Sequence, residues 1–113
     1  MAKVKISQSL KKEIFKRFQE ESKKVFKLLM SLKETPSKGK TLGVVAGLTI
    51  KELKYKSFRF YFITDGFKLK CLDEDSLVDL LIKFVRMSNK KSQQKTINEI
   101  RKILQTLGPK GFT

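Results

Sequence analysis

The sequence predicts an α+β domain, in which helices pack on a face of an antiparallel sheet. Three observations predict this class. Apolar residues recur at helical spacing in the first third of the chain and again near its end. Between these parts, aromatic and β-branched residues form short runs that turn sequences separate. The chain has 113 residues, of which 40% are hydrophobic, so it suits a single domain spanning residues 1–113.

The N-terminus is expected to form a short strand. Residues 2–7 alternate, with Val4 and Ile6 apolar between polar neighbours, and this pattern is typical of a half-buried strand. A helix should follow, because Ser7 or Ser9 can cap it by accepting a hydrogen bond from the first turn.

Two helices in a hairpin are expected next. Their apolar stripes are Leu10, Ile14, Phe15 and Phe18 for the first, and Val25, Phe26, Leu28, Leu29 and Leu32 for the second. The polar residues 19–24 interrupt the pattern, so one long helix with a solvated segment is the alternative to a bend around residues 20–22. We prefer the hairpin, because a single stripe would place Ser22 at its centre. The helical region should end near Glu34, since Pro36 disfavours the α conformation in the residue before it.

The middle of the chain predicts an antiparallel meander after a loop over residues 36–43. Its expected parts are a strand over 44–55 with a possible bulge near 52–53, a tight connection at 56–57, an aromatic strand over 58–63, a hairpin turn at 65–66, an alternating segment over 67–72 and an acidic turn at 73–76. These strands are short and turn-bounded, as antiparallel strands usually are.

The last third predicts a strand and a helix. Residues 77–87 form an apolar run that suits a central strand buried on both faces, although the same residues also fit helical spacing. A polar loop over 88–93 then leads to a C-terminal helix. Its stripe contains Ile97, Ile100, Ile103 or Leu104, and Leu107, and Gly108–Pro109 ends it. The predicted order is therefore strand, two helices, a meander of three or four strands and a helix.

Charge is the strongest functional signal. The chain has 26 Lys and Arg against 11 Asp and Glu, which gives a net charge of +15. Such a domain should attract a polyanion such as RNA, DNA, an acidic protein or an anionic membrane surface. Because only four of the 26 are arginine, a general lysine bias in composition is the alternative explanation.

Several function classes are excluded by composition. The chain has no histidine and one cysteine, Cys71, so a zinc site, a histidine-based triad and an internal disulfide framework are all excluded. No apolar run approaches the roughly 18 residues that span a bilayer, and the first residues lack the apolar core of a signal peptide. We therefore expect a cytoplasmic protein that makes no membrane contact.

Basic residues on the predicted sheet are the candidate site, because strands hold side chains more rigidly than helix surfaces do. They are Lys51, Lys54, Lys56, Arg59, Lys83 and Arg86. Arg59 interrupts an otherwise apolar strand, so it lies on an outward face or directs its planar guanidinium at a phosphate. Tyr61 shares that face and is a candidate for stacking on an unpaired base, whereas Phe58, Phe60 and Phe62 alternate with it as core residues.

These features together resemble the RelE/ParE toxin superfamily. The resemblance lies in the two-helix N-terminus, the segment from Leu53 and Lys54 to Arg59 and Phe62, and the strand that ends in Arg86. The part from Leu80 onward, LLIKFVRMSNKKSQQKTINEIRKIL, is most similar to the HigB-like branch. The resemblance covers nearly the whole chain and implies the RelE-like fold.

The resemblance implies the toxin of a type II toxin–antitoxin pair that cuts mRNA on the ribosome. The ribose 2′-OH attacks the phosphodiester, and the reaction needs no metal and no cofactor. By position it assigns catalysis to Lys54, Arg59 and Arg86. We expect RNA binding by Lys51, Lys56, Tyr61, Lys83, Lys90 and Lys91. Lys56 or Lys51 would serve as a base if neighbouring cations lowered its pKa. The implied partners are an acidic cognate antitoxin, the ribosome and mRNA.

The C-terminal tail departs from the family pattern. RelE-type enzymes often carry a terminal Tyr or His for proton transfer, and residues 108–113 contain neither. This leaves Tyr55, Tyr61 or a lysine for that step, or else an inactive protein. Two alternatives to an endoribonuclease therefore stay open: a ParE-like inhibitor of DNA gyrase, and a non-catalytic RNA-binding member of the fold.

Overall fold

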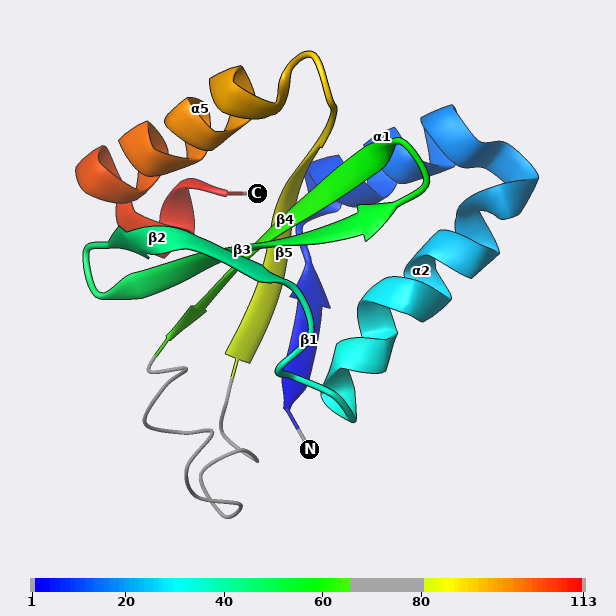
Figure 1. The fold of residues 1–113 in the computed structure, drawn as a ribbon, viewed down its shortest axis with the longest axis horizontal. Coiled ribbons are helices and arrows are strands. Elements are labelled where there is room, and N and C mark those ends of the chain that lie inside the picture. Colours follow the sequence, from blue (N-terminus) through cyan, green and yellow to red (C-terminus); the bar gives the residue numbers. More distant parts are fainter. Residues whose placement is uncertain (1, 66–80, 113) are drawn as a thin grey trace.

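The computed structural model describes residues 2–65 and 81–112 (Figure 1). Along the chain the elements are β1 (Lys3–Ile6), α1 (Gln8–Phe18), α2 (Ser22–Met30), β2 (Lys40–Val45), β3 (Leu48–Tyr55), β4 (Phe58–Asp65), β5 (Leu81–Asn89) and α5 (Gln93–Thr106). Single 3₁₀ turns lie at Gln19–Glu21, Ser31–Lys33 and Gly108–Gly111. The predicted α+β order of strand, two helices, meander and C-terminal helix is confirmed.

The strands form one sheet in the order β1-β5-β4-β3-β2. β2 to β5 pair antiparallel with their neighbours, whereas β1 lies parallel to β5 at one edge. The pairing of β3 with β4 runs without a shift from Leu48 opposite Asp65 to Tyr55 opposite Phe58. The bulge expected near residues 52–53 is therefore wrong; the register shifts lie between Thr41 and Gly43 and between Tyr61 and Phe62.

Two predicted loops are shorter than expected. β2 begins at Lys40 and pairs with β3, so the loop predicted over residues 36–43 is wrong in its second half. An edge strand needs only backbone hydrogen bonds to one neighbour, which explains why its side chains show no alternation. β5 likewise extends to Asn89, into the predicted polar loop, and residues 81–87 form the strand rather than the helical alternative. The predicted features over 66–80 lie outside the described residues.

The two-helix prediction is confirmed, with the bend at residues 19–21. Ser7 caps α1 by accepting a hydrogen bond from the Leu10 amide at 3.4 Å. α1 ends at Phe18, and Gln19 has a φ of 48°, which turns the chain out of the helix. The buried Ser22 hydroxyl then donates to the Ile14 carbonyl at 3.3 Å, so the second helix folds back onto the first.

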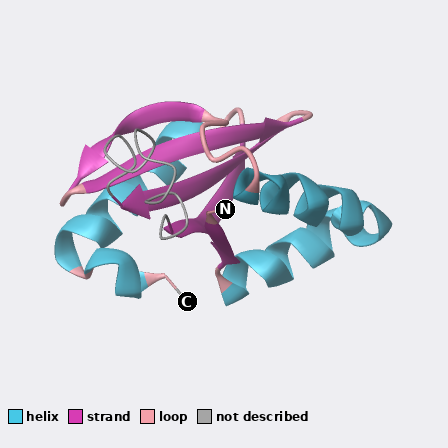
Figure 2. Ribbon diagram, turned by 90° about the horizontal axis from the view of Figure 1, so that it is seen from below, coloured by secondary structure: helices cyan, strands magenta, loops and turns pink. Residues whose placement is uncertain are grey.

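Helices cover both faces of the sheet, rather than the single face that the residue pattern predicts (Figure 2). α1 and α2 bury one face; its core is Ala2, Val4, Leu10, Ile14, Val25, Leu29, Leu32, Leu53, Phe60, Phe62, Ile82, Phe84 and Met87. α5 buries the other; its core is Val45, Ile50, Tyr61, Ile63, Val85, Ile97, Ile100, Leu104 and Phe112. Strand residues that alternate in sequence thus enter two different cores.

The helices of the described residues are too short or too polar to cross a bilayer.

Candidate functional site

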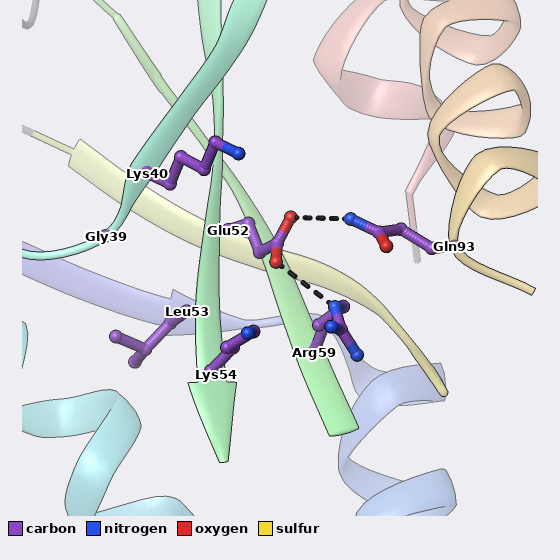
Figure 3. Close-up of a pocket in the computed structure, with 7 residues that line it drawn as sticks. All are labelled: Gly39, Lys40, Glu52, Leu53, Lys54, Arg59 and Gln93. Carbon is purple, nitrogen blue, oxygen red and sulfur yellow. Dashed lines mark hydrogen bonds and ion pairs between the residues drawn. The ribbon is translucent and has the colours of Figure 1, made fainter. Parts of the chain in front are cut away.

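A hollow of about 460 Å³ opens where α5 begins, on the sheet face that α5 covers (Figure 3). It is lined by Gly39, Lys40, Glu52, Leu53, Lys54, Arg59 and Gln93. These residues come from the start of β2, from β3 and β4, and from the first turn of α5. Residues from four elements therefore meet in the hollow. Three of their side chains are cationic: Lys40, Lys54 and Arg59.

The β3–β4 hairpin determines which side chains meet in the hollow. Lys54 lies directly opposite Arg59, and Glu52 lies opposite Tyr61. Since side chains alternate along a strand, these four residues project from the same face of the sheet. A two-residue turn at 56–57 closes the hairpin; Lys56 there has a φ of 54°, the left-handed conformation that such turns require.

Arg59 is buried next to a carboxylate. The side chains of Arg59 and Glu52 are 9% and 6% exposed, and the Arg59 Nε lies 3.3 Å from the Glu52 Oε1. The Arg59 guanidinium also donates to the Ser57 carbonyl at 3.4 Å, and the Gln93 side chain donates to the Glu52 Oε2 at 3.1 Å. Among the described residues, however, the buried Arg59 Nε makes no hydrogen bond. The guanidinium thus has a counterion but retains an unused donor.

Lys40 and Lys54 add exposed ammonium groups at the rim of the hollow. With Arg59 they place three positive charges against the single negative charge of Glu52. The residues that line the hollow therefore carry a net positive charge. Arginine suits such a site, because its planar fork can hold two phosphate oxygens.

Arg86, the third predicted catalytic residue, does not join this site. It lies opposite Tyr61 on β5 and donates from Nε to the Glu99 carboxylate of α5 at 2.8 Å. Its guanidinium also donates to the Val85 carbonyl and stacks over the Phe112 ring, 5.1 Å from the ring centre. Arg86 therefore shares a sheet face with Lys54 and Arg59 but does not line the hollow, and its contacts hold α5 and the C-terminal tail. Its catalytic role stays a prediction.

Two predicted RNA-binding residues are inside the protein. Tyr61 is completely buried in the core under α5, and its hydroxyl lies 2.7 Å from the Ser88 hydroxyl. Burial raises the pKa of the Tyr61 phenol, so it is not suited to act as a base. Lys51 is buried on the opposite face, where its ammonium donates to the Ser37 carbonyl and lies 5.8 Å from the centre of the Phe62 ring. The predicted base-stacking and surface roles of Tyr61 and Lys51 are wrong.

Two residues predicted as candidates for proton transfer, Lys56 and Tyr55, lie at the β3–β4 turn and contact Glu21. Lys56 forms an ion pair with Glu21, and this contact raises the pKa of Lys56. A lysine base requires the opposite shift. The Tyr55 hydroxyl donates to the same Glu21 carboxylate at 2.8 Å, which raises the pKa of Tyr55 as well. Both groups therefore hold their protons more firmly than in water.

The remaining predicted RNA-binding residues, Lys83, Lys90 and Lys91, differ in their contacts and exposure. Lys83 donates to the Phe112 carbonyl at 3.0 Å, so it fastens the C-terminal tail to β5. Lys90 and Lys91 are exposed in the short connection between β5 and α5, beside the end of the sheet that carries the β3–β4 turn. Lys90 and Lys91 alone of these three remain available for contact with a polyanion.

Three polar side chains of the lining are not among the residues that the sequence predicts for the site: Lys40, Glu52 and Gln93. Glu52 stands two positions before Lys54, so strand alternation predicts that the two share a face. Lys40 and Gln93 have no comparable signal, because both come from segments expected to be loops. The described residues contain no group of three His, Cys, Asp or Glu able to hold a metal ion.

Comparison with known proteins found no family model, no curated protein and no solved structure that matches this chain.

Proposed function

We propose that this chain is an RNA-cutting toxin of a type II toxin–antitoxin pair, of the RelE/ParE kind. The observation that carries the proposal is the placement of Lys54 directly opposite Arg59, beside a hollow that also contains Lys40. The net charge of +15 supports RNA as the substrate and an acidic antitoxin as the partner. Its site of action would be the ribosome in the cytoplasm, where mRNA is bound.

In this proposal Arg59 and Lys54 hold the scissile phosphodiester. The RNA 2′-OH attacks the phosphorus and loses its proton to water, the P–O5′ bond breaks, and the leaving 5′ oxygen takes a proton from water. A 2′,3′-cyclic phosphate and a 5′-OH are formed. Negative charge grows on the non-bridging oxygens during this step, and the two cations stabilise it. Lys40 stands at the rim, where it contacts a neighbouring phosphate of the same strand. Lys90 and Lys91 extend the positive surface around the start of α5.

One observation favours a second candidate, RNA binding without cleavage. Both arginines on this sheet face lie beside a carboxylate, Arg59 beside Glu52 and Arg86 beside Glu99. Neither carries an uncompensated charge in the free protein, and the candidate bases Tyr55 and Lys56 hold their protons firmly. A protein of this kind would still bind RNA through its exposed lysines.

Substitution of Lys54 by alanine tests the proposal most cleanly, because Lys54 is exposed and its loss should leave the fold intact. Loss of one group that stabilises charge in the transition state typically lowers the rate about 100-fold. We therefore expect inducible Lys54→Ala to stop arresting growth and to produce far fewer cleaved transcript ends. Lys23→Ala is the matched control, since it removes the same charge from an exposed position on α2.

The outcomes separate the two candidates. Cleavage by Lys54→Ala at the wild-type level would refute the catalytic assignment. If the wild-type protein binds RNA but yields no new transcript ends, the second candidate is correct. Loss of activity in Lys23→Ala as well would show that total charge, rather than the hollow, is responsible.

A further inference from the structure

We propose that Glu52 is an internal counterion for Arg59, which an RNA phosphate replaces on binding. The inference rests on the proposed function in one respect only: that the hollow receives a phosphate. It assigns to Glu52 a role that opposes binding, so that the affinity of the site is lower than its three cations alone would produce.

The geometry of the Arg59–Glu52 contact supports this role. The Arg59 Nε and the Glu52 Oε1 are 3.3 Å apart, and the Nε makes no hydrogen bond among the described residues. On the same sheet face, the Arg86 Nε donates a hydrogen bond to Glu99 at 2.8 Å. A buried donor without an acceptor is costly. A ligand oxygen that enters the hollow would therefore accept the hydrogen bond from the Arg59 Nε that Glu52 does not accept.

Gln93 explains how the carboxylate stays in place when Arg59 turns to a ligand. Its side-chain amide donates to the Glu52 Oε2 at 3.1 Å from the first turn of α5 (Figure 3). The Glu52 side chain is almost fully buried, so its charge is poorly screened by water. A phosphate beside Arg59 would therefore lie within a few ångströms of a fixed negative charge, which repels it.

Glu52→Gln tests this inference directly. The substitution removes the charge, keeps the side-chain volume and retains an oxygen that accepts from Gln93. We expect Glu52→Gln to bind fluorescein-labelled oligouridylate about tenfold more tightly than wild type in an anisotropy titration, since a poorly screened like charge is removed. The matched control is Glu99→Gln, which raises the net charge equally beside Arg86 but outside the hollow. It should change the affinity less than about twofold.

Thermal unfolding provides a second readout. Without Glu52 the buried Arg59 has no counterion, so Glu52→Gln should melt below wild type in the absence of ligand. Added oligouridylate should then raise its melting temperature more than that of wild type, because the ligand supplies the missing negative charge. If Glu52→Gln does not fold, Glu52→Asp replaces it; the shorter carboxylate withdraws from Arg59, and we expect a smaller gain in affinity.

Binding by Glu52→Gln no tighter than by Glu99→Gln would overturn the inference. So would weaker binding, which would show that Glu52 holds Arg59 in the orientation that the ligand requires. The inference and the proposed function fail separately. If wild type cuts transcripts while Glu52→Gln gains no affinity, only the inference falls; if Glu52→Gln gains affinity and no variant cuts RNA, only the proposed cleavage falls.

Discussion

The two faces of the sheet bury different chemistry. Toward α1 and α2 the strands present an aromatic core, in which the Phe62 and Phe84 rings lie 4.8 Å apart and Phe60 lies 6.1 Å from Phe18. Toward α5 the same strands present Tyr61, Arg59 and other polar groups beside aliphatic residues. The α1/α2 face is mainly aromatic, although it also contains the buried Lys51 and its hydrogen bond to Ser37. The α5 face contains a buried ion pair, between Arg59 and Glu52.

This difference shows why the candidate site lies on the α5 face. Packed aromatic rings satisfy one another and leave no group for a ligand. Buried polar groups are satisfied only by specific partners, and each partner can in principle be exchanged for a ligand atom. Arg59, with a nearby carboxylate but an unused donor, is the clearest example. We therefore expect a ligand to exchange contacts on the α5 face rather than on the aromatic face.

The largest expected effect is that of Phe60→Ala on the aromatic face. Phe60 is completely buried, and truncation of a buried phenylalanine typically costs about 3–5 kcal/mol of unfolding free energy. Urea unfolding followed by circular dichroism measures this cost. Phe15→Ala is the control, because the Phe15 side chain is 59% exposed and should change the unfolding free energy by less than about 1 kcal/mol. Equal losses in both variants would contradict the placement of Phe60 at the centre of the aromatic core.

Arg59→Ala should have the next largest effect on stability. It leaves the Glu52 carboxylate buried without its counterion, which typically costs about 3 kcal/mol. A double-mutant cycle with Glu52→Ala measures the coupling by urea unfolding, and we expect the double variant to lose less than the sum of the single losses.

The exposed Arg86–Glu99 pair is the reference for this cycle. Its side chains are 25% and 50% exposed, so the coupling between Arg86→Ala and Glu99→Ala should stay below about 1 kcal/mol. A coupling at Arg59 and Glu52 no larger than at Arg86 and Glu99 would show that burial on the α5 face does not strengthen its ion pair.

Much of the fold is predictable from the sequence, because local pattern and packing agree on the aromatic face. The stripes around Ile14 and Leu29 and the alternation of Phe60 and Phe62 identify buried positions that the structure confirms. Boundaries were missed where backbone pairing decides the conformation. β2 forms at an edge of the sheet through hydrogen bonds to β3, and its side chains show no periodicity that would predict a strand.

The site was harder to predict, because it depends on contacts between distant segments. Pairing of the meander strands in sequence order correctly brings Lys54 and Arg59 together. It does not reveal that α5 covers this face. Because α5 packs there, Tyr61 is buried and Arg86 donates a hydrogen bond to Glu99. The contact of Gln93 with Glu52 joins residues 41 positions apart in the chain, and no local pattern encodes it.

The smallest expected effect concerns the rim of the aromatic face, where Glu21 accepts hydrogen bonds from Lys56 and Tyr55. These contacts, that from Lys56 above all, lower the pKa of the Glu21 carboxyl. A carboxyl whose pKa is lower in the folded state adds stability above its ordinary pKa and loses it as the pH falls through the lowered value. Glu21→Gln should therefore be slightly less stable than wild type at neutral pH, and the difference should vanish in acid.

Glu13 gives this prediction a control of opposite sign. Burial raises the pKa of the Glu13 carboxyl, although Arg86 and Arg17 act against the shift. The folded state thus disfavours the ionised form, and stability falls as the pH rises through the raised pKa. Urea unfolding at neutral pH should find Glu13→Gln at least as stable as wild type, and Glu21→Gln less stable. If both variants lose stability equally at every pH, the loss reflects side-chain packing rather than charge, and the polar rim of the aromatic face has no electrostatic role in stability.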